Sequence, residues 1–398
     1  MTNIAILGFG VVGSGVAKLI TDNKNEVAKL GGDEINIKYI LDLRDFPDSP
    51  FADKVIHNYD KIVNDPEISV VVEVMGGSHP AYEYTVAALK AGKSVITSNK
   101  EVVANFGDEF LALAKECGVC YRFEASVGGG IPVISPIISC IKHNKVSEVR
   151  GILNGTTNYI LTQMFTYGQS FESALKDAQK KGDAESNPDA DILGTDACRK
   201  IAILTALVSE KLAPVSGIHT EGITKIRDND VSAANKIGAT IKLVGRGIIK
   251  NGKPMAMVAP FIVPTDMPLS QVSGVYNAVE VVAEPLGNVM FYGQGAGAGA
   301  TASAVVSDLM QIMTTGTAYP APVFEKCGDF ASFDNFSCKR YLALSKSDVE
   351  AVLKTLIENS DVIYDGEDEV QLITSEMTEA ELTKMLGDTK PLSHIRML

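Results

Sequence analysis

The chain has 398 residues, a formal net charge of −13 and a hydrophobic content of 45%. This length provides for two or three domains with a large core, and a charged fraction of 21% excludes a chain that is disordered by its composition. The acidic balance argues against nucleic acid or an anionic membrane surface as a partner. No apolar run reaches the ~20 residues of a membrane span, and residues 1–13 lack the pattern of a secretory signal.

The six cysteines are few for this length and indicate a reducing compartment, so we expect a cytoplasmic protein. Only Cys117 and Cys120 have the C-x-x-C spacing of a zinc site, and neither a second pair nor a histidine cluster lies beside them. We therefore interpret them as structural thiols rather than as metal ligands.

The first third of the chain alternates β-branched runs with helical stretches, which is typical of a parallel sheet covered by helices. It predicts a dinucleotide-binding domain at residues 1–130 that ends in a glycine-rich hinge. The expected strands are 3–7, 35–42, 70–74, 94–97 and 118–123, and the expected helices are 13–22, 81–91 and 100–116.

The middle of the chain is less regular and favours an α+β domain for substrate binding and dimerisation at residues 131–325. A second glycine-rich stretch at 293–299 precedes a helix at 301–314, and we expect residues 297–320 to pack back on the first domain. The other expected strands are 146–153, 241–249 and 255–262, and the other expected helices are 158–166, 170–180 and 195–210.

The last residues have the order β-α-β-β-α-β of a ferredoxin-like unit, which we place at residues 338–398. The fold class is therefore α/β, with an N-terminal Rossmann domain, the α+β domain and this small C-terminal unit. Its elements are strand 340–344, helix 346–358, strands 361–364 and 369–375, helix 378–386 and strand 392–397.

A complete G-x-G-x-x-G motif follows the first strand and opens the first helix. Its glycines allow a tight turn and a close approach of the backbone, and the start of the helix offers N–H groups to a pyrophosphate. An ordinary glycine-rich turn is the alternative interpretation. The expected cofactor-binding residues are Gly8, Phe9, Gly10, Val11, Val12 and Gly13.

The end of the second strand bears on the choice between NAD and NADP. Asp42 can accept hydrogen bonds from the adenine ribose hydroxyls, which favours NAD, whereas Arg44 can pair with a 2′-phosphate. Asp42 could also be a plain turn cap. We expect NAD with a slight preference and allow for use of both.

Asp196 and Lys200 lie four residues apart on a predicted helix and so share one face. An exposed ion pair is the ordinary interpretation of this spacing. Because residues 201–208 carry no charge, however, the helix is largely buried, and Lys200 lies where it enters the core. Burial lowers the pKa of a lysine, which suits proton transfer near neutral pH.

Four carboxylates, Asp183, Glu185, Asp189 and Asp191, precede this helix. They could form a solvated loop, or they could bind the ammonium group of an amino-acid substrate.

Several segments, in order over residues 1–320, together resemble the homoserine dehydrogenases. They read G-x-G-x-x-G at 8–13, E-x-M-G-G at 73–77, N-K-x-x-V-A at 99–104, E-A-S-V-G-G-G-I-P at 124–132, N-G-T-T-N-Y-I-L at 154–161 and D-x-x-G-x-D-A-x-R-K-x-A-I-L at 191–204. The resemblance implies a monofunctional enzyme with a Rossmann domain, a substrate and dimerisation domain and often a regulatory domain.

The resemblance also implies the reversible NAD(P)H-dependent reduction of L-aspartate 4-semialdehyde to L-homoserine, in threonine, methionine and isoleucine biosynthesis, by a homodimer or a dimer of dimers. Lys200 matches the proton donor to the carbonyl oxygen, and Lys100 matches a second lysine near cofactor and substrate. The implied substrate-binding residues are Glu185, Asp191 and Asp196, and further cofactor contacts are Thr97, Lys100, Gly182 and Gly297.

A monovalent cation, Na+ or K+, is implied as well. Glu124, Val127, Gly129 and Ile131 match the family's cation site, mostly through backbone carbonyl groups. Oxygen ligands on a glycine-rich loop suit a hard cation. A hinge without an ion is the alternative.

The chain departs from the family in two places. Residues 294–299 read Q-G-A-G-A-G where the family has G-P-G-A-G, so the closure over the nicotinamide is altered. The C-terminal unit resembles an ACT domain, but residues 345–349 replace its D-x-P-G loop and lack the glycine that approaches an amino-acid effector. Inhibition by threonine is therefore a hypothesis.

Two rival functions remain open from the residues themselves. An aldehyde dehydrogenase would need a cysteine nucleophile, and Cys198 is the candidate, although its position on the helix directs it away from Lys200. A nucleotide-sensing regulatory protein would keep the dinucleotide site without catalysis. The joint presence of Lys100, Glu185, Asp196 and Lys200 argues against that alternative.

Overall fold

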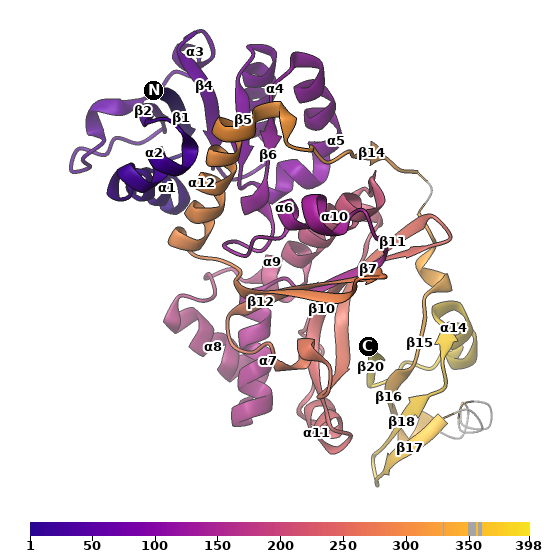
Figure 1. Cartoon of the computed structure of the whole chain (residues 1–398). Coiled ribbons are helices and arrows are strands. Elements are labelled where there is room, and N and C mark those ends of the chain that lie inside the picture. Colours follow the sequence, from indigo (N-terminus) through magenta and orange to yellow (C-terminus); the bar gives the residue numbers. More distant parts are fainter. Residues whose placement is uncertain (329, 349–355, 357–359) are drawn as a thin grey trace. The chain divides into compact units, whose positions relative to one another are not determined.

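The computed structural model describes residues 1–328, 330–348, 356 and 360–398 (Figure 1). The chain divides into two compact units. The first contains residues 1–149, 202–215 and 281–328, and the second contains residues 150–201, 216–280 and the described residues after 329.

A parallel sheet forms the centre of the first unit, with the strand order β3-β2-β1-β4-β5-β6 (Figure 1). This is the doubly wound order of dinucleotide-binding domains, whose ligands bind at the carboxyl ends of the central strands. All five predicted strands are confirmed, whereas the short β3 was not expected. The strands are β1 (Thr2–Leu7), β2 (Ile35–Leu41), β3 (Val55–Ile56), β4 (Ile68–Glu73), β5 (Ser94–Thr97) and β6 (Tyr121–Arg122).

The helix α12 belongs to this unit although it comes late in the chain. It packs against α1, and Val305 and Leu309 share one buried core with Val16 and Ile20 (Figure 1). The helices of the unit are α1 (Val11–Asp22), α2 (Lys24–Gly31), α3 (Asp60–Val63), α4 (Ala81–Lys90), α5 (Lys100–Cys117), α6 (Ile134–Pro136) and α12 (Ala298–Thr315). Of these, α2, α3 and α6 were not predicted.

The second unit is built on an antiparallel hairpin of β10 (Ala239–Lys250) and β11 (Lys253–Pro264). Both predicted strands are confirmed, and each is longer than expected. Asn251 and Gly252 form the turn with φ of +53° and +74°, the left-handed values that a tight Asn-Gly hairpin turn requires. β7 (Lys145–Ile152) pairs beside β10 and enters this unit with its last residues.

Helices cover this sheet. The predicted helices α7 (Gly155–Tyr167), α8 (Phe171–Lys181) and α10 (Thr195–Ser209) are confirmed. α10 begins in this unit, and its residues from 202 onward belong to the first unit. The short α9 (Asp189–Ile192) and the polar α11 (Asp228–Lys236) were not predicted. Neither were β12 (Tyr276–Glu284) and β13 (Gly287–Gln294), which carry the chain back to the first unit.

The C-terminal strands lie in the order β20-β16-β18-β17, with antiparallel pairing throughout. Numbered along the chain, this is the order 4-1-3-2 of a ferredoxin-like sheet, and β20 also pairs in parallel with β11. Most of the predicted helix 346–358 lies outside the described residues, and membership in the ACT family stays a prediction. The elements are β16 (Arg340–Ser345), β17 (Ser360–Asp365), β18 (Glu369–Thr374), α14 (Glu379–Leu386) and β20 (Ser393–Met397).

Across the ranges described above, no helix is both apolar enough and long enough to cross a lipid bilayer.

Candidate active site

The turn between β1 and α1 has the backbone shape of a dinucleotide-binding loop. Gly8 has a φ of +93°, and a Cβ on Gly13 would collide with the carbonyl oxygen of Gly8. Gly10 is the N-cap of α1, and nothing lies within 4 Å of a Cβ built on it. Phe9 is buried, whereas Val11 is 71% exposed. The N-terminus of α1 therefore opens on space in which a pyrophosphate can approach the backbone.

A cavity of about 470 Å³ beside this turn is lined by Gly8, Gly10, Asp42, Arg44 and His57, among others. Asp42 accepts a hydrogen bond from the backbone N–H of Phe9 at 2.7 Å. The Arg44 side chain donates to both carboxylate oxygens of Asp42, Nε to Oδ1 at 3.0 Å and Nη2 to Oδ2 at 3.1 Å. These bonds, with that of Arg44 the strongest, lower the pKa of Asp42 to about 2.

The two residues that were expected to decide between NAD and NADP thus lie in contact. His57 joins them, because its Nδ1 lies 2.7 Å from the carbonyl oxygen of Asp42. Sequence reasoning missed His57, since its place depends on the loop after β2 rather than on any motif. The cavity presents an ionised carboxylate and a guanidinium group together.

A buried carboxylate organises the ends of β4 and β5. Glu73 is 0% exposed and accepts hydrogen bonds from Thr97 Oγ1 at 2.5 Å and from the N–H of Met75 at 2.8 Å. Burial raises the pKa of Glu73 to about 7. The predicted cofactor residue Thr97 is likewise fully buried, and its hydroxyl group donates its hydrogen bond to Glu73.

Lys100 is the first residue of α5, where Asn99 caps the helix. The side chain of Asn99 accepts from the N–H groups of Glu101 and Val102, and its Nδ2 donates to the carbonyl oxygen of Gly77 at 2.7 Å. The cap places Lys100 at a helix N-terminus next to the glycines that follow β4. A positive charge there adds to the positive end of the helix dipole.

The two glycine-rich stretches pack against each other within the first unit. A Cβ on Gly129 would lie 2.5 Å from the carbonyl oxygen of Gly295, and the N–H of Gly130 donates to the carbonyl oxygen of Gln294 at 3.1 Å. Gly297, with a φ of +118°, is the N-cap of α12. Ala298 follows Gly297 in the chain, and a Cβ built on Gly15 would lie 3.1 Å from the carbonyl oxygen of Ala298. Gly297 is therefore close to the start of α1.

The four residues expected at a cation site lie in the first of these stretches. The carboxylate of Glu124 is already occupied by the N–H groups that open α6, those of Val133, Ile134 and Ser135, at 2.6–2.8 Å. Its contribution to a cation site would therefore be its backbone carbonyl. No described hydrogen bond is accepted by the carbonyl oxygens of Val127, Gly129 or Ile131. These oxygens suit a monovalent cation.

The second unit assembles a buried cluster around Lys200. The Nζ of Lys200 donates to Oδ2 of Asp196 at 2.8 Å and to the carbonyl oxygen of Leu153 at 2.7 Å. Asn154 Nδ2 donates to Oδ2 of Asp196 at 2.9 Å and to Oδ1 of Asp191 at 2.7 Å. Burial, and then the neighbouring charge of Asp196, raise the pKa of Asp191.

This cluster can both give a proton and hold a positive charge. An ammonium group has three N–H donors, and the third donor of Lys200 has no partner among the described residues. The predicted burial of the helix is confirmed, because residues 201–204, 206 and 207 are 0% exposed and Lys200 is 9% exposed. Asn154 was not singled out from the sequence, since its role appears only where the end of β7 meets α9 and α10.

Glu185 and Gly182 lie on the loop between α8 and α9. Gly182 ends α8 with a φ of +82°, and Glu185 is exposed. Thr156 Oγ1 donates to the carbonyl oxygen of Asp183 at 2.6 Å, which ties this loop to the first turn of α7. No described hydrogen bond joins the carboxylate of Glu185 to Asp196 or Lys200, so the structure brings together Asp191, Asp196 and Lys200 but not Glu185.

The cysteine nucleophile of the rival interpretation finds no support. Cys198 is 3% exposed, and burial raises the pKa of its thiol, which disfavours the thiolate that nucleophilic attack requires. Of the C-x-x-C pair, Cys120 is buried, as a structural thiol would be, and Cys117 is partly exposed. Within the described ranges, no group of three or more His, Cys, Asp or Glu side chains is placed to hold a metal ion.

Comparison with known proteins gives matches along most of the chain. A family model described as "Homoserine dehydrogenase" matches residues 132–310, and one described as "Homoserine dehydrogenase, NAD binding domain" matches residues 8–124. A homoserine dehydrogenase of Bacillus subtilis is 34% identical over an alignment that covers 99% of this chain and 96% of that protein.

Two solved structures show the same likeness in three dimensions. The crystal structure of a homoserine dehydrogenase from Thiobacillus denitrificans has a TM-score of 0.92 at 31% identity, covering 100% of this chain and 98% of that chain. A hyperthermophilic archaeal homoserine dehydrogenase mutant in complex with NADPH has a TM-score of 0.66 at 29% identity. The alignment of these two structures covers 78% of this chain and 97% of the archaeal chain.

The buried carboxyl group of Glu73 predicts a particular dependence of stability on pH. The folded protein keeps this proton up to a pH of about 7, whereas the unfolded chain loses it near 4.5. The contribution of Glu73 to the free energy of unfolding is therefore present at pH 4.5 and is lost as the pH rises to 7. In the parent protein we expect the free energy of unfolding to fall by up to about 3 kcal/mol through this group as the pH rises. Glu73→Gln should not show this fall when both proteins are unfolded in urea at pH 4.5 to 8.

Other titrating groups also contribute to the pH dependence, such as Asp308, whose pKa is raised by burial to about 8. Their contributions are the same in the parent protein and in Glu73→Gln, so they cancel when the two curves are subtracted. Glu26→Gln, at an exposed position on α2, is the matched control and should leave the shape of the curve unchanged. Parallel curves for the parent protein and Glu73→Gln would show that Glu73 is ionised throughout this range.

Proposed function

This chain belongs to the homoserine dehydrogenase family, and from that membership we propose that it interconverts L-homoserine and L-aspartate 4-semialdehyde. Its NAD-binding domain makes it an NAD(P)-dependent oxidoreductase of amino-acid biosynthesis. The observation that supports the specific reaction best is the buried cluster of Lys200, Asp196 and Asp191.

Lys200 is the proposed proton donor. The nicotinamide, when bound, supplies hydride to the aldehyde carbon or takes it from the alcohol. The carbonyl oxygen then needs a proton, and the third N–H of Lys200 can give one because the other two donate to Asp196 and Leu153. In the oxidation of homoserine, the neutral amine of Lys200 takes the hydroxyl proton. Such a positioned acid–base group contributes about 10²- to 10⁴-fold to the rate.

The carboxylates beside Lys200 are the proposed site of the substrate's ammonium group. Asp191 and Asp196 are both held by the amide of Asn154, and Lys200 supplies one positive charge to the pair. An amino-acid substrate brings a positive charge that these two carboxylates can bind, and a simple aldehyde does not. Glu185, exposed on the neighbouring loop, is the proposed further carboxylate that meets the substrate.

Lys100 is proposed to assist at the same oxygen. Its ammonium group adds to the positive end of α5 and would stabilise the negative charge that develops on the oxygen during hydride transfer. Thr97 and Gly182 are proposed to meet the cofactor only through their backbone, because the hydroxyl group of Thr97 is buried against Glu73.

The cofactor is NAD or NADP, and we propose use of both with NAD preferred. One solved relative is a complex with NADPH. In this chain Arg44 can pair with a 2′-phosphate, yet it already donates to Asp42, whose ionised carboxylate repels one. Ribose hydroxyl groups meet no such repulsion.

A Na+ or K+ ion is proposed at the backbone carbonyl groups of Glu124, Val127, Gly129 and Ile131. Its role would be to fix the glycine-rich stretch that packs on Gly295. A homodimer or a dimer of dimers, as in the family resemblance, is the proposed assembly.

The reaction is tested by the initial rate of L-homoserine oxidation at alkaline pH, with NAD+ and NADP+ in parallel. We expect turnover with both cofactors and a higher kcat/KM for NAD+. D-Homoserine should react far more slowly, since its ammonium group cannot meet the same carboxylates while its hydroxyl group meets Lys200. Cofactor binding without turnover of L-homoserine would contradict the proposal and favour a nucleotide-sensing protein.

The role of Lys200 predicts a large loss of turnover when its ammonium group is removed. We expect Lys200→Met to lower kcat for L-homoserine oxidation by about 10²- to 10⁴-fold, because Met keeps the length of the side chain without its proton. The affinity for NAD+, measured by fluorescence titration, should stay within about twofold.

Lys176→Met, at an exposed position on α8, is the matched control and should keep full activity. A Lys200→Met protein that still binds NAD+ and loses less than about tenfold in kcat would rule out Lys200 as the proton donor.

A further inference from the structure

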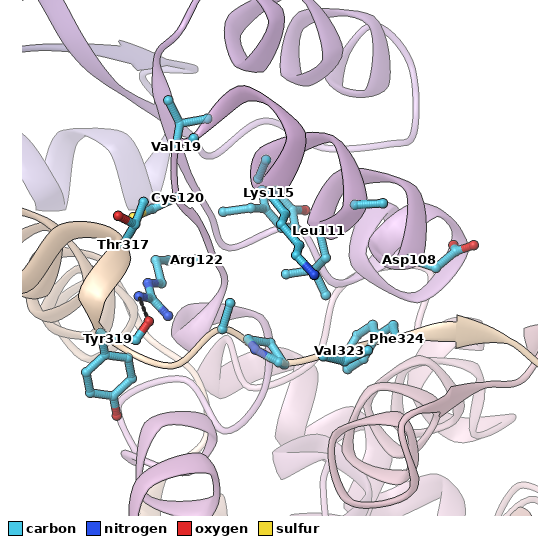
Figure 2. A pocket seen from close by; sticks show the side chains of 16 residues that line it. Asp108, Leu111, Lys115, Val119, Cys120, Arg122, Thr317, Tyr319, Val323 and Phe324 are labelled. Carbon is cyan, nitrogen blue, oxygen red and sulfur yellow. Dashed lines mark hydrogen bonds between the residues drawn. The ribbon is translucent and has the colours of Figure 1, made fainter.

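A second cavity in the first unit, of about 610 Å³, lies at the outer edge of the parallel sheet. Figure 2 shows it between α5, the edge strand β6 and the segment of residues 317–324. None of the residues that line it lines the cavity beside the glycine-rich turn. Its volume lies within the range of small-molecule sites.

The walls of this cavity are mostly apolar. α5 contributes Leu111, the edge of the sheet contributes Val119 and Cys120, and the third wall contains Val323 and Phe324 (Figure 2). Such walls suit the hydrocarbon part of a ligand, because each apolar surface that they cover is removed from water.

A buried positive charge breaks this apolar lining. Arg122 is 5% exposed, and its guanidinium group donates to the carbonyl oxygens of Pro320 and Tyr319, both at 3.2 Å, and of Gly316 at 3.5 Å. Its Nε is buried and has no hydrogen-bond partner. Its Cζ also lies 4.9 Å from the centroid of the Tyr319 ring, and among the described residues no carboxylate forms an ion pair with it. An arginine stays charged at ordinary pH, so its charge lacks a counter-ion.

The nearby acid does not supply one. Asp308 accepts a hydrogen bond from the backbone N–H of Glu124, and among the described residues it forms no ion pair with Arg122. A buried guanidinium group whose partners are all neutral keeps part of its desolvation penalty, and an anionic ligand at Arg122 would reduce that penalty.

The charges around the cavity also set the direction of such a ligand. Lys115 and Asp108 lie seven residues apart on α5, about 10 Å along the helix axis. Figure 2 shows Arg122 and Asp108 at opposite sides of the cavity with Lys115 between them. Asp108 forms an ion pair with the exposed Lys326 at 3.7 Å and keeps Oδ1 buried without a partner, so an anion is attracted more strongly at the side of Arg122 than at the side of Asp108.

We propose that this cavity binds a small monocarboxylate with an apolar chain. The carboxylate lies toward Arg122 and Lys115, and the chain lies against Leu111, Val119 and Phe324. A carboxylate fits better than a phosphate ester, because the guanidinium group has two of its five N–H donors left, one on Nη1 and that of Nε, and three carbonyl oxygens around it oppose a double negative charge.

The test uses octanoate as the probe and 1-octanol as its uncharged match, each titrated into the full chain by calorimetry at pH 7. We expect octanoate to bind at least about tenfold more tightly than 1-octanol, since a charge-assisted hydrogen bond is the difference between them. Equal affinities, or no binding of octanoate, would overturn the proposal.

Substitutions in the cavity wall test whether octanoate binds in this cavity. Arg122 also fixes the segment after α12, so its replacement risks the fold, and two milder changes serve instead. Lys115→Met removes a charge at the rim and should weaken octanoate binding about three- to tenfold. Ala112→Phe fills the exposed side of the cavity and should abolish binding, while Lys90→Met on α4 should change nothing. Unchanged octanoate binding by both Lys115→Met and Ala112→Phe would refute the assignment.

Discussion

Asn154 is the residue on which the polar centre of the second unit depends. Its single amide caps α7 and donates to both Asp191 and Asp196, so one side chain fixes two carboxylates that would otherwise repel each other. Asp196 in turn holds Lys200, whose second bond reaches the carbonyl oxygen of Leu153, next to Asn154 in the chain. The end of β7 and the helices α7, α9 and α10 are therefore fixed by one closed network, and Lys200 keeps one donor for chemistry.

Carboxylates that accept backbone N–H groups hold the first unit in a similar way. Asp42 follows β2, Glu73 ends β4 and Glu124 follows β6, and each accepts from the loop or helix that comes next to it in space. All three lie at the carboxyl ends of parallel strands, the edge where ligands of this fold bind. The loops that meet the cofactor are thus fixed by buried or partly buried acids rather than by apolar packing alone.

Sequence reasoning predicted most of this fold because the strongest patterns are local. The β-branched run of residues 94–97 and the periodicity of α5 and α10 can be recognised without knowing what packs against them, and these elements agree closely with the structure. The polar helix α11 and the strands β12 and β13 were missed, since their identity depends on what they pack against. In the site, the i,i+4 spacing indicated the pair of Asp196 and Lys200, whereas Asn154 and His57 act across distant segments that no local pattern joins.

The most direct test of Lys200 as the acid–base group is chemical rescue of Lys200→Ala. The initial rate of L-homoserine oxidation is measured with added ethylamine, and with tetramethylammonium as a cation of similar size that cannot exchange a proton. We expect the rate to rise in proportion to the concentration of unprotonated ethylamine and to stay at the level of the variant with tetramethylammonium. No rescue by ethylamine in a protein that binds NAD+ and L-homoserine, or equal rescue by both, would contradict proton transfer by Lys200.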